Sequence, residues 1–140
     1  MDIVIDFDGT VVTHEFPKVG KGIGAVDVLK ELVENGHNLI LFTMRSDIDN
    51  PQSDDPEITA KPGKYLTDAI DWFKEREIPL YGIQSNPKQH EWTKSPKAYG
   101  QLIIDDAALG IPLVYNETYS KRPYVDWRAV RCMLELKGLI

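Results

Sequence analysis

Residues 3–10 of the chain read Ile-Val-Ile-Asp-Phe-Asp-Gly-Thr, an apolar run that ends in two aspartates, a glycine and a threonine. Buried parallel strands are continuous apolar runs, and open α/β sheets place their chemistry at the carboxyl ends of the strands. Residues two apart on a strand share a face, so we expect Asp6 and Asp8 to meet the same ligand. Asp8-Gly9 is also typical of a hairpin turn between the apolar residues 3–7 and 11–12, and the rest of the chain has to decide between the two interpretations.

Length and composition predict one globular domain covering residues 1–140, with 42% apolar and 27% charged residues. The net charge of −6 argues against nucleic acid or an anionic membrane as a partner without excluding a local basic site. The single Cys132 allows no internal disulfide, which is compatible with the cytoplasm. The first apolar run is interrupted by Asp6 and Asp8 and has no basic segment before it, so we expect neither a signal peptide nor a membrane span.

Helical and strand-like segments alternate along the chain. Apolar residues recur at helical spacing over residues 25–35 and again after Pro62, and Asp126 is placed to cap a final helix. Apolar strand-like runs occupy the following residues: 38–43, 80–83, 101–106 and, as an edge strand opened by Pro112, 112–115. This alternation predicts an α/β fold, a three-layer Rossmann-like arrangement with a central parallel sheet of about five strands. A hairpin at Asp8-Gly9 would break the alternation, so we favour the parallel strand.

Between the second strand and the second helix lies a polar loop, residues 46–62. It contains one lysine, Lys61, and the following acidic residues: Asp47, Asp49, Asp54, Asp55 and Glu57. Structureless loops of this length are often functional. We favour a solvated surface excursion over a metal-binding loop.

Three of the predicted strands end in polar side chains, which a parallel sheet would bring to one edge. These are Asp6 and Asp8, Thr43, and the pair Asp105 and Asp106. Clustered carboxylates repel one another unless a cation compensates them, and ligands that are all oxygen atoms favour a hard cation such as Mg²⁺. Lys97, a few residues before the fourth strand, is expected to reach the same edge, with Lys94 as the alternative.

These motifs, in this order, resemble those of the haloacid dehalogenase (HAD) superfamily of aspartate-nucleophile phosphotransferases. Residues 6–10 match its first motif, Thr43 the second, Lys97 the third, and the run 103–106 the fourth. The resemblance spans residues 3–106. It implies a HAD-like fold and a Mg²⁺-dependent phosphatase, a phosphoric monoester hydrolase.

The resemblance also implies roles for individual residues. Asp6 would attack phosphorus and form a phosphoaspartate, and Asp8 would act as general acid and then as general base. Thr43 would hydrogen-bond a phosphoryl oxygen, and Lys97 would neutralise charge on the phosphoryl group and on Asp6. The implied Mg²⁺ ligands are Asp6, the backbone carbonyl of Asp8 and an acid of the fourth motif, Asp105 being favoured over Asp106 although the order could be reversed.

The motifs leave no room for an inserted cap domain, so we expect a capless member with an open site. Gly9, Thr10 and Arg45 are the candidate substrate-binding residues, Arg45 as a bidentate partner for phosphate or as a surface arginine with equal weight. We expect a small phosphorylated metabolite, such as a sugar phosphate or a nucleotide, as substrate. The alternatives are a polynucleotide 3′-phosphatase, or a phosphate-binding partner protein without turnover; homo-oligomerisation stays open.

Overall fold

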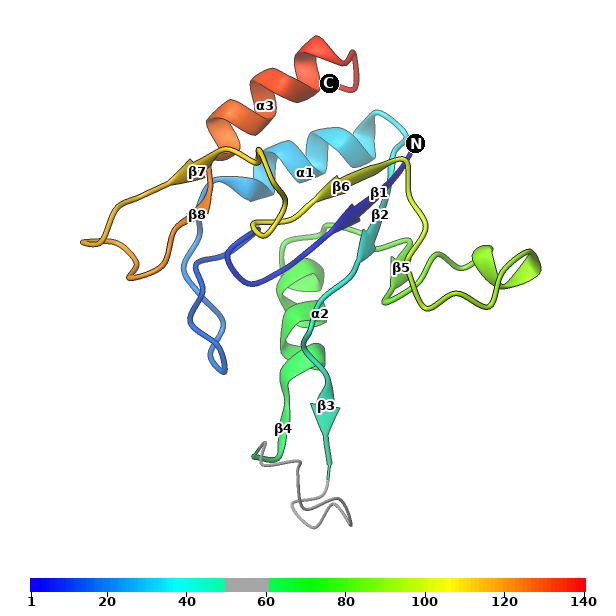
Figure 1. Ribbon diagram of the computed structural model, residues 1–140, viewed down its shortest axis with the longest axis horizontal. Helices are drawn as coiled ribbons and strands as arrows, with labels where there is room; N and C mark the ends of the chain where they lie inside the picture. The colour runs from blue at the N-terminus through cyan, green and yellow to red at the C-terminus, as the bar shows by residue number, and fades with distance from the viewer. Residues whose placement is uncertain (50–60) are drawn as a thin grey trace.

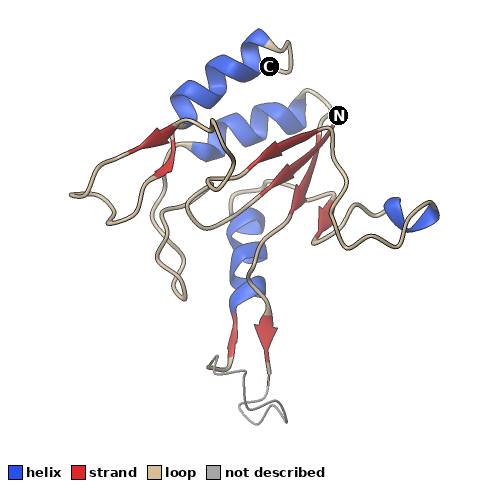
Figure 2. Ribbon diagram, in the orientation of Figure 1, coloured by secondary structure: helices blue, strands red, loops and turns tan. Residues whose placement is uncertain are grey.

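The computed structural model describes residues 1–49 and 61–140 (Figure 1). Its helices are α1 (Ala25–Glu34), α2 (Tyr65–Glu75) and α3 (Trp127–Leu136), with a short 3-10 helix, η1 (Gln89–Glu91). Its strands are β1 (Asp2–Ile5), β2 (Asn38–Leu41), β3 (Asp47–Ile48), β4 (Gly63–Lys64), β5 (Gly82–Ile83), β6 (Leu102–Ile104), β7 (Leu113–Val114) and β8 (Tyr124–Val125). The α/β class predicted from the sequence is confirmed (Figure 2).

The central sheet is parallel and has four strands in the order β5-β2-β1-β6 among the residues described. The expected strand at residues 112–115 does form, as β7, but it does not join this sheet. It pairs antiparallel with β8 in a separate two-stranded ribbon. The prediction of about five central strands was therefore wrong by one, because the partner of β7 is supplied by a segment ten residues further along the chain.

The two faces of the sheet are covered differently. Ile3 and Ile5 of β1 pack into the main core cluster with buried side chains from all three helices. Val4 and Ile40 point to the opposite face, where they form a small second cluster with Ala98. The cover on that face thus comes from the irregular segment between β5 and β6, which in Figure 1 carries η1 away from the sheet.

The helices begin and end for recognisable local reasons. Helix α1 runs almost as far as expected, and Gly36 beyond it adopts a φ of 85°, the left-handed conformation that glycine takes up at low cost. Asp126 caps α3, since its side chain accepts hydrogen bonds from the backbone N–H groups of Arg128 and Ala129. No helix in residues 1–49 and 61–140 is both long and apolar enough to cross a membrane.

The predicted 46–62 loop is not irregular at its start, because Asp47–Ile48 pairs as β3 with Gly63–Lys64, the strand β4 that directly follows the loop, in a short antiparallel ribbon. Within it, Asp47 accepts hydrogen bonds from the backbone N–H and hydroxyl of Thr67 in the first turn of α2. Three of its acidic residues, Asp54, Asp55 and Glu57, lie outside the described residues.

The strand order creates a switch point between β1 and β6. From β1 the chain moves outward through β2 to β5, and then returns to place β6 on the other side of β1. In open α/β sheets, ligands bind outside the carboxyl ends of the strands where the order reverses in this way. Asp6 follows β1 directly, and Asp105 and Asp106 follow β6 directly, so the fold itself places these three carboxylates at its expected binding site.

Candidate active site

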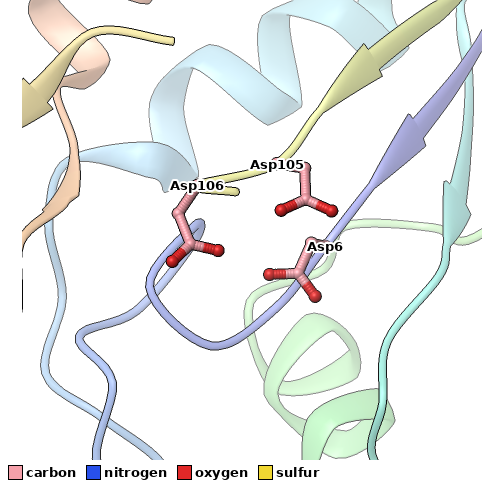
Figure 3. A group of neighbouring side chains, drawn as sticks. All are labelled: Asp6, Asp105 and Asp106. Atoms are coloured by element: carbon pink, nitrogen blue, oxygen red, sulfur yellow. The ribbon is translucent and has the colours of Figure 1, made fainter. Parts of the chain in front are cut away.

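Three carboxylates converge at the end of β1 and β6. One oxygen from each of Asp6, Asp105 and Asp106 lies within 4.8 Å of the others. Figure 3 shows the three side chains pointing into one space between the two strand ends. The hydrogen bond from the Asp6 N–H to the Ile104 carbonyl (3.0 Å) continues the β1–β6 ladder past the strands and fixes this approach.

Asp6 is held in an environment that disfavours its charge. Burial raises the pKa of its carboxyl to about 7, and repulsion from Asp105 and Asp106 adds to the effect. The Phe7 N–H and the Thr10 hydroxyl act in the opposite direction without cancelling it. The pKa of Asp106 is also raised, first by burial and then by Asp105. A cation bound among the three carboxylates would offset the cost of burying their negative charge and would reduce their mutual repulsion.

The turn after β1 brings Thr10 beneath the carboxylates. Its hydroxyl donates to Asp6 Oδ2 at 2.9 Å and accepts from the Asp106 N–H at 3.0 Å, and the residue is fully buried. Gly9 makes the turn with a φ of 81°, and a Cβ at this position would lie 2.6 Å from Asp106 Oδ2. Both were candidate substrate-binding residues; the structure places them where they position the carboxylates.

The C-terminal part of the chain supports this turn from behind. The N–H of Val125, in β8, donates to the Gly9 carbonyl at 2.9 Å. The indole N–H of Trp127, in α3, donates to the Thr10 carbonyl at 2.7 Å, in a fully buried contact. This contribution of residues beyond 106 was not foreseen from the motifs, which end there.

Asp8 does not join the triad. Its carboxylate is held by the guanidinium of Arg45 through two parallel hydrogen bonds, Nε–Oδ2 at 2.6 Å and Nη2–Oδ1 at 2.8 Å. The other N–H groups of Arg45 donate to the carbonyls of Pro17, Lys18 and Tyr65. All five donors of a side chain that is 1% exposed are thus used inside the protein. The guanidinium also lies over the rings of Phe7 and Phe16, with its Cζ 5.1 Å and 5.2 Å from their centres.

Thr43 lies beside the cleft that contains the triad, and its backbone is held by Gln84. The Gln84 side-chain amide accepts from the Thr43 N–H at 2.8 Å and donates to the Thr43 carbonyl at 2.7 Å. The Thr43 hydroxyl accepts from the Arg45 N–H at 3.1 Å. Among the described residues this hydroxyl has no acceptor, so its proton is available to a ligand in the cleft.

Lys97 is not brought to the triad. It lines a different cleft, together with Trp92, Tyr99 and Ile103 on the irregular segment and β6. Neither Lys97 nor Lys94 is among the described residues that line the cleft with Asp6, and neither affects the pKa of the Asp6 carboxyl. The cation that the third motif implies is therefore absent from its expected position.

The cleft around the triad has a volume of about 470 Å³. Besides the expected carboxylates, Thr43 and Arg45, its lining includes residues that the sequence analysis did not select: His14, Phe16, Met44, Ala107 and Arg122. Arg122 Nη1 lies 3.1 Å from His14 Nε2. Met44 and Ala107 directly follow the predicted site residues Thr43 and Asp106, whereas His14 and Phe16 lie in the loop before α1 and Arg122 in the loop between β7 and β8. No local sequence pattern indicates that these two loops meet.

No family model and no curated protein matches the chain. A solved structure of a conserved protein from Bacteroides thetaiotaomicron is similar to it, with a TM-score of 0.70 and 31% sequence identity. The similarity covers 98% of this chain and 91% of the Bacteroides chain. The name of that protein states no activity, so the chemistry has to be argued from the site. The chain belongs to the same family as this conserved Bacteroides protein.

Proposed function

We propose that the protein is a Mg²⁺-dependent phosphomonoester hydrolase of HAD type that works through a phosphoaspartate on Asp6. The observation that carries the proposal is the convergence of Asp6, Asp105 and Asp106 within 4.8 Å at the switch point of the sheet. The order of the sequence motifs and the buried Thr10 that links two of these carboxylates support the same conclusion.

The donor set fits Mg²⁺. All three candidate side-chain ligands are carboxylates from Asp6, Asp105 and Asp106, and hard cations prefer oxygen. Burial, and then the neighbouring Asp105 and Asp106, raise the pKa of the Asp6 carboxyl, and a bound cation would act against both effects. Bound Mg²⁺ would polarise the phosphoryl group and neutralise part of its charge.

In the first step, a carboxylate oxygen of Asp6 attacks phosphorus, the ester P–O bond breaks, and the leaving oxygen takes a proton from Asp8. In the second step, water attacks the phosphoaspartate, gives a proton to Asp8, and releases orthophosphate and the free Asp6 carboxylate. The bidentate contact with Arg45 holds Asp8 as a carboxylate at the wall of the cleft. Before Asp8 acts as the acid, it must therefore take up a proton from solvent, and one of its oxygens must release Arg45. The Thr43 hydroxyl donates to a phosphoryl oxygen.

The size of the cleft supports a small substrate. A volume of about 470 Å³ accommodates a phosphorylated metabolite such as a sugar phosphate or a nucleotide. The negative net charge favours such a molecule over a polyanion.

Hydrolysis of p-nitrophenyl phosphate with Mg²⁺ or with EDTA tests the proposal. We expect Mg²⁺-dependent turnover by the wild type, its loss in Asp6→Asn, and no change in Asp71→Asn. Asp71 is a matched control because it is an exposed aspartate on α2 with no side-chain hydrogen bond to the described residues. If no turnover occurs and acetyl phosphate also fails to phosphorylate Asp6, the catalytic proposal is wrong.

A further inference from the structure

Two loops from distant parts of the chain meet at the rim of the cleft. The loop of residues 13–22 follows the turn after β1, and the loop of residues 115–123 connects β7 and β8 (Figure 1). The ammonium of Lys21 donates to the Tyr119 carbonyl and lies 4.3 Å from the centre of the Tyr119 ring. The Tyr119 hydroxyl in turn donates to the Gly22 carbonyl. These contacts hold the two loops together.

Their junction brings His14 and Arg122 into the lining of the cleft that contains the triad. Arginine can only donate, so the His14 Nε2 accepts the hydrogen bond from Arg122 Nη1 at 3.1 Å. Arg122 is exposed, and its hydrogen bond to His14 uses one of its five N–H groups.

The charges in the cleft call for a further cation when a phosphate ester is bound. Arg45 is already committed to Asp8, which leaves the three carboxylates of the triad. A divalent cation compensates only two of these charges, and a phosphate monoester brings additional negative charge. Among the described residues that line the cleft, the remaining basic side chains are Arg122 and His14.

We propose that Arg122, oriented by His14, is the anion-binding residue of this cleft and contacts the phosphoryl group of the substrate in place of Lys97. The geometry that carries this is the paired Arg122 and His14 in the same cleft as Asp6, with Lys97 in a different one. The choice of a phosphoryl group as the anion rests on the proposed function. A guanidinium suits this task because its planar N–H groups match two phosphate oxygens.

Binding of inorganic phosphate in the presence of Mg²⁺, measured by isothermal titration calorimetry, tests the inference without relying on turnover. We expect Arg122→Gln to weaken phosphate binding at least tenfold. Arg122→Lys should restore part of the affinity, because lysine keeps the positive charge but lacks the paired, coplanar N–H donors of the guanidinium. Lys97→Gln should bind like the wild type. Arg128→Gln is a matched control, since Arg128 is exposed and lines another cleft.

The positioning role of His14 has its own readout. His14→Gln should weaken phosphate binding in the wild-type background and have no further effect in Arg122→Gln, as expected for a residue that acts through Arg122. An effect of equal size in both backgrounds would show that His14 does not act through Arg122.

The outcomes separate this inference from the proposed function. If the wild type hydrolyses p-nitrophenyl phosphate but Arg122→Gln binds phosphate as tightly as the wild type does, the proposed role of Arg122 is wrong. The proposed phosphatase activity is then unaffected. Arg122-dependent phosphate binding, with neither hydrolysis nor phosphorylation of Asp6 by acetyl phosphate, would support the anion site and contradict the phosphatase. A wild type that binds no phosphate, or a Lys97→Gln variant that alone loses binding, would overturn the inference.

Discussion

Arg45 and Asp8 form a bidentate ion pair in the interior, although 37 residues separate them in the chain. Their side chains are 1% and 12% exposed, so water compensates neither charge if the other is removed. The pair links the turn after β1 to the segment after β2. The position of Asp8, the candidate acid–base residue, therefore depends on an ion pair that also stabilises the folded protein.

Replacing Arg45 by Gln should destabilise the protein by about 3 kcal/mol or more, because a buried carboxylate loses its partner. Chemical denaturation measures the change in unfolding free energy. In the double variant Arg45→Gln/Asp8→Asn, the buried charge is gone, so we expect part of the lost stability to return. Lys64→Gln removes an exposed ion pair to Asp49 and should leave the unfolding midpoint unchanged. Equal effects at Arg45 and Lys64 would contradict the structural importance of the buried pair.

Gly9→Ala should cost stability and weaken Mg²⁺ binding, since its φ is 81° and the new Cβ would lie 2.6 Å from Asp106 Oδ2. Gly36→Ala provides the matched control. Its φ is 85°, and a Cβ at this position would meet nothing within 4 Å. Gly36→Ala should therefore cost only the backbone strain of an alanine in the left-handed conformation, about 1 kcal/mol. We expect Gly9→Ala to cost about 1–2 kcal/mol more than Gly36→Ala. If the two substitutions cost the same and Mg²⁺ binding is unaffected, the close approach of Gly9 to Asp106 is unimportant.

Thr10→Val should leave the fold intact but lower Mg²⁺ affinity by roughly tenfold, the scale seen when a group that orients a metal ligand is removed. Valine fills a similar volume but neither donates to Asp6 nor accepts from the Asp106 N–H. Thr10→Ser keeps both hydrogen bonds and should retain most of the affinity. Calorimetric titration with Mg²⁺ measures the difference. Equal affinities for the serine and valine variants would show that the Thr10 hydroxyl does not orient the metal ligands.

The metal-free protein should lose stability as the pH rises. The folded state holds the Asp6 proton up to a pKa of about 7, whereas the unfolded chain releases it near 3.8, so folding favours the protonated form between these values. Stability should be highest below pH 4 with respect to this group and should fall until about pH 7, by up to about 4 kcal/mol.

Thermal melts in EDTA at several pH values, compared between wild type and Asp6→Asn, isolate this contribution from those of other groups. The variant should be the more stable of the two at pH 8, and its advantage should shrink at pH 5. Mg²⁺ should stabilise the wild type at pH 8 and have little effect on Asp6→Asn. A constant difference between the two proteins across this range would contradict the raised pKa of Asp6.

Much of the framework could be predicted from local sequence. The apolar runs before Asp6 and Asp105 identified β1 and β6, and the spacing of Val28, Leu29 and Leu32 identified α1, because these signals depend on periodicity within one element. The convergence of Asp6 with Asp105 and Asp106 followed from the parallel order of their strands. The choice of pairing partner for a strand carries no such local signal. The ribbon of β7 with β8 is one example, and it cost the central sheet its expected fifth strand.

The environment of each polar side chain was also beyond local prediction. Arg45 was a candidate ligand for phosphate, but whether its donors are free depends on Asp8 and on the carbonyls of Pro17, Lys18 and Tyr65. The position of Lys97 depends on the path of the irregular segment across the sheet.

The central claim is that Asp6 carries the phosphoryl group during turnover. Rapid acid quenching of the enzyme with Mg²⁺ and p-nitrophenyl phosphate, followed by borohydride reduction, converts an aspartyl phosphate to homoserine, which peptide mass spectrometry locates in the sequence. We predict homoserine at position 6, and none when EDTA replaces Mg²⁺. Turnover without reduction of Asp6, or with homoserine at another aspartate, would contradict the account.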